Sequence, residues 1–215
     1  KSKLNLINSG TEGIIEVTGN TVIDALFMIS KQNVVPKFSG IDWKKKVIFV
    51  SVHRRENWGL RLQEIIKGLK LILREFRDIT ILLPLHPNPI IKEPFLEAFQ
   101  NTKEVILIKP LNYSELVGTI KNCYALLTDS GGLQEEAPSL GKPVLVLRKT
   151  TERPEAIAAG TAKLIGTDPE SILRETGNIL INKKAYQKMS KAINPFGDGK
   201  ASERILKICK EFLNI

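Results

Sequence analysis

The sequence predicts an α/β protein built on a three-layer, Rossmann-like parallel sheet. Short apolar runs rich in β-branched residues alternate with segments whose apolar residues recur at helical spacing. This alternation repeats at roughly 25 to 30 residues per unit, which is typical of strand–helix–strand connections in a parallel sheet. The predicted strands are apolar throughout, as expected for parallel strands that helices cover on both faces.

Six apolar runs are the predicted strands. The first, VIFVSV at residues 47–52, is followed by ITILLPL at 79–85. Four more runs continue the pattern: EVILIKPL at 104–111, YALLTDS at 124–130, PVLVL at 143–147 and TAKLIG at 161–166. Each is short enough for a strand and is bounded by polar residues, glycine or proline, so the strand boundaries follow from the same pattern.

Helices are predicted between these strands. In residues 59–76 the apolar side chains recur at helical spacing. Residues 90–100 predict a second helix with Pro94 near its first turn, where proline is tolerated. Residues 114–123 predict a third, short helix that begins at Ser114 as its N-cap. The connections between strands are therefore helical crossovers, as a parallel sheet requires.

The two ends of the chain differ from this pattern. Residues 17–30, VTGNTVIDALFMIS, predict a turn followed by an amphipathic helix, and residues 33–46 predict a linker into the first strand. The tail at 201–214, ASERILKICKEFLN, predicts a helix with one apolar side. Two interpretations are open: these end segments cover the sheet, or they reach to a domain outside this chain.

Composition narrows the classes of function. The net charge of +9 suits an anionic ligand. The lysines are scattered, aromatics make up 6%, and no nucleic-acid motif is evident, so phosphate on a small ligand is favoured over nucleic acid. No apolar run approaches the roughly 20 residues of a membrane span. Cys123 and Cys209 lack metal or CxxC spacing, and the first residues lack a signal-peptide core, so we predict a cytoplasmic protein without a metal site.

Polar residues gather directly after the predicted strands. In an open parallel sheet, ligands bind beyond the carboxyl ends of the strands. Both histidines of the chain, His53 and His86, stand at such ends. Four arginines do so as well: Arg54, Arg55, Arg148 and Arg153. This coincidence predicts a ligand site at the carboxyl edge of the sheet.

The stretch TDSGGLQEEAPSLGKPVLVL, after the fourth strand, is the strongest local candidate. Gly131 and Gly132 allow a sharp turn and close approach of the backbone to a ligand. Ser130 either caps the helix that follows the glycines or donates to a phosphate oxygen. Glu135 and Glu136 either accept the hydroxyls of a sugar or ribose, or balance the helix dipole.

The other candidates also have two interpretations. His53 is either a structural hydrogen-bonding residue or a ligand contact that can exchange a proton. Arg54 either binds the ligand or pairs with a nearby acid, and His86 either contacts the ligand or only ends its strand. Arg153 either holds a phosphate through two hydrogen bonds or pairs with one of its neighbouring glutamates.

Six motifs together resemble the non-hydrolysing UDP-N-acetylglucosamine 2-epimerase family. They are VTGNTVIDAL, HRREN, HPNP, TDSGGLQEEAPSLGKPVLVLR, TTERPEA and NPFGDGKAS, in that order from about residue 17 to the end. The family interconverts UDP-GlcNAc and UDP-ManNAc by eliminating UDP to a 2-acetamidoglucal and adding it back. Its members resemble glycosyltransferase-B enzymes, with two Rossmann-like halves and the nucleotide sugar between them.

The motifs begin late in the family's sequence, so the resemblance implies the C-terminal half. Residues 1–40 would be an inter-domain segment and helix from the end of the N-terminal half, 41–200 the UDP-binding domain, and 201–215 a C-terminal helix. The carboxylates that handle the sugar C2 proton would come largely from the other half. The isolated chain is therefore expected to be inactive, and the full-length protein is expected to form a homodimer.

The resemblance also implies roles for individual residues. His53 would be catalytic, contacting the diphosphate and assisting departure of UDP. Arg54 and His86 match an activator site for a second UDP-GlcNAc found in some bacterial members. No cofactor is expected, because the reaction moves a proton and UDP. The residues implied to bind UDP are Ser130, Gly131, Gly132, Glu136, which would accept the ribose hydroxyls, and Arg153.

Other functions remain open from the sequence. The chain could be the donor-binding domain of a glycosyltransferase-B enzyme, because such a domain shares the sheet and the Gly-Gly-Glu loop. A hydrolysing epimerase that releases free ManNAc is a close variant. A module that binds a nucleotide without catalysis is a third alternative.

Overall fold

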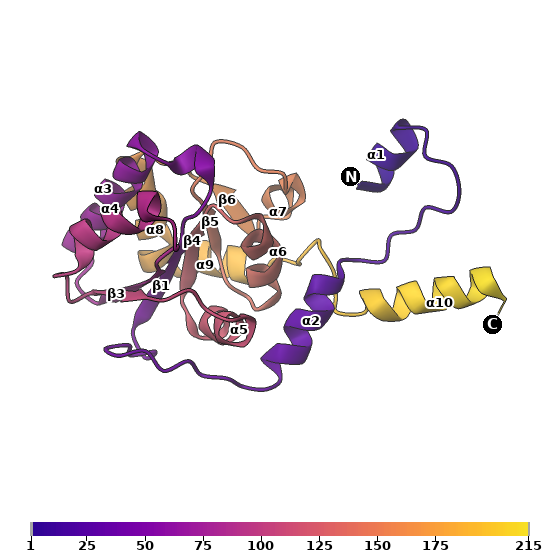
Figure 1. The fold of residues 1–215 in the computed structure, drawn as a ribbon, viewed down its shortest axis with the longest axis horizontal. Helices are drawn as coiled ribbons and strands as arrows, with labels where there is room; N and C mark the ends of the chain where they lie inside the picture. Colours follow the sequence, from indigo (N-terminus) through magenta and orange to yellow (C-terminus); the bar gives the residue numbers. More distant parts are fainter. Residues whose placement is uncertain (1, 215) are drawn as a thin grey trace.

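The computed structural model describes residues 2–214 and contains one parallel sheet with helices on both faces (Figure 1). The strand order is β3-β2-β1-β4-β5-β6, and every pair of neighbours is parallel. The strands are β1 (Lys46–Ser51), β2 (Ile79–Pro84), β3 (Val105–Ile108), β4 (Ala125–Thr128), β5 (Val144–Val146) and β6 (Ala162–Leu164). The predicted Rossmann-like sheet is confirmed.

The helices of the described chain fall into those that cover the sheet and those at the ends. The covering helices are α3 (Leu60–Glu75), α4 (Pro89–Phe99), α5 (Tyr113–Asn122), α6 (Gly131–Ser139), α7 (Pro154–Ala158), α8 (Pro169–Ile181) and α9 (Lys183–Ser190), with a 3-10 turn η1 (Arg55–Asn57) after β1. The remaining helices are α1 (Ser2–Asn8), α2 (Thr21–Ser30) and α10 (Ala201–Leu213).

Each face of the sheet has its own apolar core. Alternate residues of β1 point to opposite faces, so Ile48 and Val50 pack with α3, α4 and α8, whereas Val47 and Phe49 pack with α5, α6 and α7. The helices α3 and α8 pack closely. A Cβ atom added to Gly68 in α3 would lie 2.9 Å from the Ile172 side chain in α8. The sheet is therefore rigidly held between two helical layers, as its apolar strands predict.

The topology places one particular pair of strand ends together. The strand order runs outward in one direction from β1 to β3 and in the other from β4 to β6, so the order reverses between β1 and β4. These two strands are in register, with Ser51 opposite Thr128. In open α/β sheets, ligands bind in the crevice at such a switch point. The loops that follow β1 and β4 therefore frame the expected site.

Three local predictions are corrected. The helix α5 is capped by Asn112, not Ser114: Asn112 Oδ1 accepts from the N–H of Glu115 at 2.9 Å, and Glu115 Oε2 accepts from the N–H of Asn112 at 3.0 Å. In α4 the proline at the start is Pro89, and Pro94 lies inside the helix. The helices α1, α7 and α9 were not predicted; they have seven, five and eight residues, which is short for recognition by apolar periodicity.

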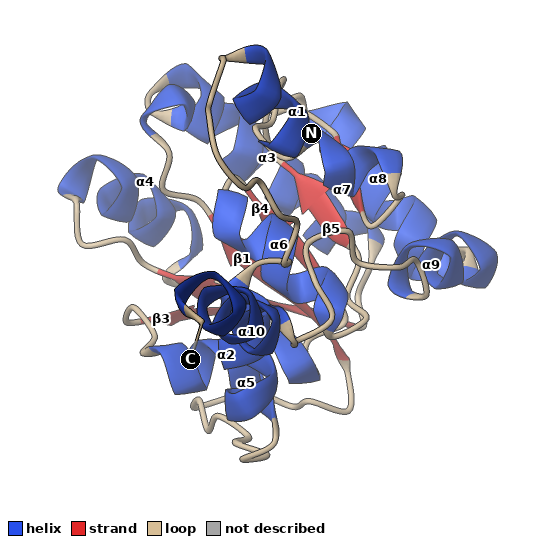
Figure 2. Cartoon of the chain, turned by 90° about the vertical axis from the view of Figure 1, so that its right-hand side faces the viewer, coloured by secondary structure: helices blue, strands red, loops and turns tan. Residues whose placement is uncertain are grey.

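The chain ends extend from the sheet (Figures 1 and 2). The helix α2 packs on α5 and α6, and α10 begins beside α2, where Asp24 accepts from the N–H groups of Ala201 and Ser202 at 3.1 and 2.6 Å. The helices α1 and α10 then project away from the sheet. No helix within residues 2–214 is long and apolar enough to cross a membrane. The three-part division at residues 40 and 200 stays a prediction.

Candidate functional site at the carboxyl edge of the sheet

The start of α6 is open to a ligand. The helix begins at Gly131, immediately after β4, with Ser130 at the N-cap position. The Ser130 side chain makes no capping hydrogen bond, although its backbone N–H donates to Thr128 Oγ1 at 3.0 Å. The capping interpretation of Ser130 is therefore wrong. The first N–H groups of α6 lack a side-chain cap, and such groups, with the positive end of the helix dipole, attract anions.

Two arginines flank this helix start. A Cβ built on Gly131 would lie 3.3 Å from Nη2 of Arg54 and 3.9 Å from Nη2 of Arg153. Arg54 follows β1, and Arg153 follows β5, so the sheet topology brings together residues far apart in sequence. Guanidinium groups bind phosphate oxygens through paired hydrogen bonds. The helix terminus and the two guanidinium groups gather hydrogen-bond donors around Gly131, while Arg153 also pairs with Glu135 and Arg54 lies 3.8 Å from Glu152.

Asp129, at the end of β4, organises the loop that carries His53. Its side chain is fully buried and accepts hydrogen bonds from the backbone N–H of His53 at 3.1 Å and of Arg54 at 2.9 Å. The Asn57 amide donates to Asp129 Oδ2 at 2.9 Å and to the Leu147 carbonyl at 3.1 Å. A buried carboxylate without these donors would be costly, so this network fixes the loop after β1 against β4.

His53 and His86 lie side by side. Their ring centroids are 6.5 Å apart and the ring planes differ by 17°. Both line a pocket of about 180 Å³ at the ends of β1, β2 and β3. The remaining lining is mostly apolar: Phe49, Ser51, Val52, Pro84, Leu85, Pro87, Pro110, Leu111 and Leu116. The pocket is therefore a mostly apolar cavity with two imidazole rings in its wall.

Glu136 is buried one turn into α6. Tyr113, the first residue of α5, donates from its hydroxyl to Glu136 Oε1 at 2.9 Å. Burial raises the pKa of Glu136, and the neighbouring Glu135 raises it further, whereas the hydrogen bond from Tyr113 lowers it. Burial and the nearby Glu136 also raise the pKa of Tyr113. The carboxylate of Glu136 is thus a buried acceptor for a hydroxyl group, here that of Tyr113.

Glu135 connects Arg153 to the N-terminal segment. Its Oε1 accepts from Arg153 Nε, and its Oε2 accepts from the Asn20 amide at 2.5 Å. Arg153 could from its sequence either hold a phosphate or pair with Glu152 or Glu155; in the structure its salt bridge runs to Glu135. Because Asn20 also caps α2, this contact ties α2 to the helix that begins the site.

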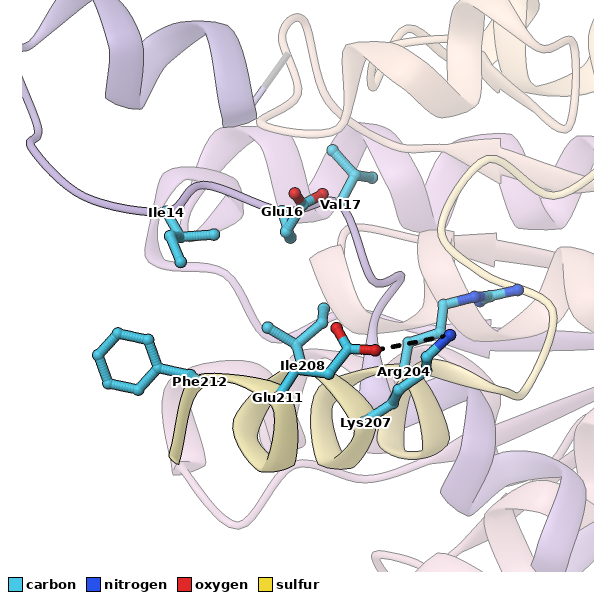
Figure 3. A pocket seen from close by; sticks show the side chains of 8 residues that line it. All are labelled: Ile14, Glu16, Val17, Arg204, Lys207, Ile208, Glu211 and Phe212. Atoms are coloured by element: carbon cyan, nitrogen blue, oxygen red, sulfur yellow. Dashed lines mark ion pairs between the residues drawn. The ribbon is translucent and has the colours of Figure 1, made fainter. Parts of the chain in front are cut away.

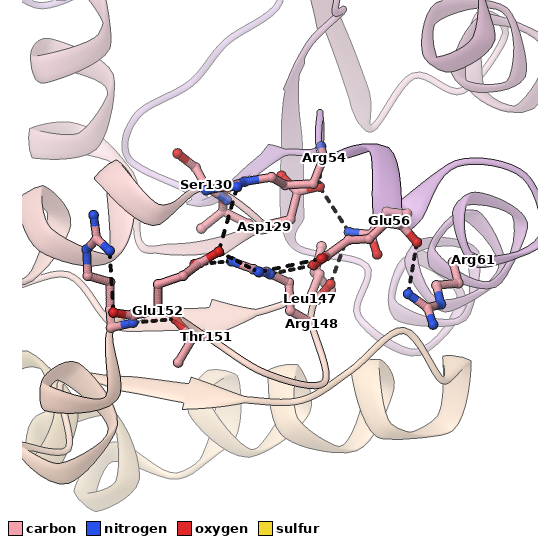
Figure 4. A network of polar contacts seen from close by, with 12 residues as sticks. Arg54, Glu56, Arg61, Asp129, Ser130, Leu147, Arg148, Thr151 and Glu152 are labelled. Carbon is pink, nitrogen blue, oxygen red and sulfur yellow. Dashed lines mark hydrogen bonds and ion pairs between the residues drawn. The ribbon is translucent and has the colours of Figure 1, made fainter.

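A second polar network joins the loops after β1 and β5 (Figure 4). Arg148 is only 5% exposed, and its guanidinium donates to Glu56 at 2.5 Å and to Glu152 at 2.6 Å. Glu152 also lies 3.8 Å from Arg54. The hydrogen bond from Arg148 is the main reason why the pKa of Glu152 falls to about 2. Arg148 therefore sets the spacing of the two loops that carry Arg54 and Arg153.

The sequence predicted residues at the carboxyl edge of the sheet. It did not predict the buried contacts that hold the loops of the candidate site in place. All the candidate residues lie at the carboxyl ends of strands or on α6, and Arg54 and Arg153 meet at Gly131. Asp129 and Tyr113 were given no role, and Arg148, predicted among the strand-end arginines of a ligand site, is instead buried in ion pairs with Glu56 and Glu152. Tyr113 had a signal, since it follows the third strand in NYS, whereas the partners of Asp129 and the partner Glu56 of Arg148 depend on strand order.

Fold and site define a class of protein: a Rossmann-like α/β domain of the glycosyltransferase-B type, with a candidate anion site at the switch point of its sheet. A C-terminal domain of a glycosyl transferase group 1 family protein from Francisella tularensis shares the fold, with a TM-score of 0.55, 12% identity, and coverage of 87% of this chain and 96% of that chain. At this identity the likeness concerns the fold alone.

The chain belongs to the UDP-N-acetylglucosamine 2-epimerase family, whose model matches residues 1–210. The Escherichia coli K12 UDP-N-acetylglucosamine 2-epimerase is 45% identical over 219 residues, covering 97% of this chain and 58% of the relative. This chain thus spans little more than half the length of that protein. The resemblance to UDP-N-acetylglucosamine 2-epimerases inferred from the motifs is confirmed.

Two solved structures of relatives contain ligands. The co-structure of S. aureus MnaA with UDP has a TM-score of 0.92 and 39% identity, covering 99% of this chain and 59% of that chain. The UDP-GlcNAc 2-epimerase from Neisseria meningitidis bound to UDP-GlcNAc has a TM-score of 0.89 and 39% identity, covering 98% and 59%. In both, the likeness extends over nearly all of this chain.

Proposed function

We propose that this chain binds UDP between β1 and β4 and is the UDP-binding part of an enzyme that interconverts UDP-GlcNAc and UDP-ManNAc. One observation carries the proposal: the uncapped start of α6 lies between Arg54 and Arg153 at the switch point of the sheet. Fixed donors and cations at that place stabilise the charge that a departing diphosphate gains. The relatives solved with UDP and with UDP-GlcNAc support the choice of ligand.

Each part of UDP has a matching group in the proposed arrangement. The diphosphate would accept from the N–H groups of Gly131 and Gly132, from the Ser130 hydroxyl and from Arg153. The ribose hydroxyls would donate to Glu136, whose Oε1 already accepts from Tyr113. The uracil ring would enter the apolar pocket beside His53, which has a volume of about 180 Å³. His53, at the mouth of that pocket, would assist UDP departure, and Arg54 and His86 remain the candidates for an activator site.

The binding step can be tested on the 215-residue chain by isothermal titration with UDP. Ser130→Ala removes one donor to a charged oxygen, an interaction of about 1.5 kcal/mol or more, so we expect UDP to bind about tenfold more weakly. Ser190→Ala, at the end of α9 on the opposite edge of the sheet, is the matched control and should leave the affinity unchanged. Absence of UDP binding to the unchanged chain, or equal affinities for both variants, would overturn the proposal.

The non-hydrolysing subtype is part of the proposal and is tested on the product. A protein that contains this chain and turns over UDP-GlcNAc should release UDP-ManNAc that keeps its UDP, and the C2 position should acquire deuterium from heavy water. Release of free ManNAc and UDP would assign the hydrolysing subtype instead. The homodimer, the cytoplasmic location and the inactivity of the isolated chain stay predictions.

A further inference from the structure

The environment of His53 distinguishes its two ring nitrogens. The Nδ1 atom lies 3.4 Å from Asp129 Oδ1. The Asp129 carboxylate is fully buried and is fixed by backbone and Asn57 donors, so it cannot turn away from the ring. An ionised carboxylate only accepts hydrogen bonds. A proton on Nδ1 is therefore attracted to Asp129, whereas a lone pair on Nδ1 would face negative charge.

The environment of His86 has the opposite polarity. Its Nδ1 atom accepts a hydrogen bond from the backbone N–H of Asn88 at 3.1 Å. A nitrogen that accepts from an amide must present its lone pair, so the proton of the neutral ring stands on Nε2. The donor is the backbone N–H of the N-cap residue of α4, and the start of that helix holds it in place. The neutral His86 ring therefore carries its proton on Nε2, whereas the environment of His53 favours a proton on Nδ1.

We infer that the two stacked histidines are held in opposite tautomers, with Asp129 as the positioning residue for His53. In the neutral state His53 carries its proton on Nδ1 and presents the Nε2 lone pair. His86 carries its proton on Nε2 and presents a donor. The rings lie 6.5 Å apart on the wall of one pocket, so that wall offers one proton acceptor beside one hydrogen-bond donor.

The consequence for catalysis rests on the proposed function. Because Asp129 keeps the Nδ1 proton in both charge states of His53, a proton can move between His53 and a phosphate oxygen of UDP only at Nε2. The imidazolium gives that proton to the oxygen and becomes the neutral tautomer that Asp129 already stabilises, so the ring need not turn. His86 donates a hydrogen bond but is not arranged for exchange, since protonation of its Nδ1 would break the bond from Asn88.

The test uses nitrogen-15 NMR of the two imidazole rings in the unliganded chain. The chain has two histidines, so assignment needs only one variant. At about pH 8.5, well above the ordinary histidine pKa of about 6.5, ring nitrogens with and without a proton have well-separated shifts. We expect the Nδ1–H form of His53 and the Nε2–H form of His86, each in about tenfold excess or more.

Two variants test the causes separately. Asp129→Asn keeps the shape but loses the charge, and its amide can donate to Nδ1, so His53 should shift toward the Nε2–H form while His86 is unchanged. Asn88→Pro removes the backbone donor at a φ of −69°, which proline adopts, so His86 should lose its preference while His53 keeps its own.

The spectrum of the unchanged chain decides the inference even where a variant does not fold. A proton on Nε2 of His53, or on Nδ1 of His86, overturns it. Equal spectra of the Asp129→Asn chain and the unchanged chain overturn the role of Asp129. The measurement needs no ligand, so a chain that binds UDP with the wrong tautomers refutes this inference alone, whereas correct tautomers without UDP binding refute the proposed function alone.

Discussion

The carboxyl edge of the sheet and the two chain ends use the same kinds of residues in opposite ways. At the edge, charged side chains such as Asp129 and Arg148 are buried, and each is held by several partners. At the ends, apolar side chains are exposed: α1 buries none of its residues, and α10 buries only Ala201. Phe212, near the end of α10, is 70% exposed.

Figure 3 shows the exposed region closely: the irregular segment with Ile14, Glu16 and Val17 faces α10 across an open groove of about 540 Å³. Most of the apolar stripe of α10 is exposed: Leu206, Phe212 and Leu213 are exposed and Ile208 is half-buried, although the periodicity is that of a helix that packs on a neighbour. Helical periodicity therefore shows that one side of a helix is suited to packing. Only burial in the structure shows whether that side stabilises the fold.

The largest expected contrast comes from the same substitution in each region. Leu69→Ala, in α3, removes a side chain that is 0% exposed, and should lower the free energy of unfolding by about 2 to 5 kcal/mol. Leu206→Ala, in α10, removes one that is 57% exposed, and should change it by less than about 0.5 kcal/mol. Because both leucines are helical, the change in helix propensity is the same.

Urea denaturation followed by circular dichroism measures both variants. A Leu206→Ala variant as destabilised as Leu69→Ala would mean that α10 is packed in solution, for example against a second copy. In that case the effect should depend on protein concentration, because association stabilises by mass action.

A smaller contrast is expected for two arginines that each pair with acids. Arg148→Met removes a buried guanidinium and leaves two carboxylates to be hydrated, and should cost about 1 to 3 kcal/mol of unfolding free energy. Arg204→Met breaks the exposed pair with Asp198 near the start of α10 and should cost clearly less. The same urea series measures both, and equal losses would contradict the importance of burial.

The sequence predicted those parts of the molecule that local patterns determine. Continuous apolar runs predicted the sheet, and strand ends predicted that Arg54, Arg153 and Gly131 lie at one edge, where the structure brings them together. The cap of α5 was predicted at Ser114, although the spacing of Asn112 and Glu115 is that of a capping box and would have identified the correct residue. The role of Asp129 and the pairing of Arg148 with Glu56 could not be predicted, because these partners lie on loops that only the strand order β1-β4-β5 brings together. The second partner of Arg148, Glu152, lies only four residues further along the chain.

The smallest expected effect concerns the pH dependence of stability. One ion pair in each region should contribute to it, and the two contributions should respond differently to salt. The pKa of Glu152 falls to about 2 mainly through its hydrogen bond with Arg148, and the pKa of Asp198 falls to about 2 mainly through Arg204. A lowered carboxyl pKa contributes stability that is present above the unfolded-state value. That value is 4.5 for Glu152 and 3.8 for Asp198, and the contribution is lost as pH falls toward 2.

The variants Glu152→Gln and Asp198→Asn should therefore differ from the unchanged chain at neutral pH, and the difference should disappear on acidification through these ranges. At 1 M salt the screening length is about 3 Å, so the Asp198 contribution should largely vanish, because both of its partners are exposed. The Glu152 contribution should persist, because Arg148 is buried. Equal loss of both contributions in salt would show that burial of one partner alone does not protect an ion pair at the carboxyl edge.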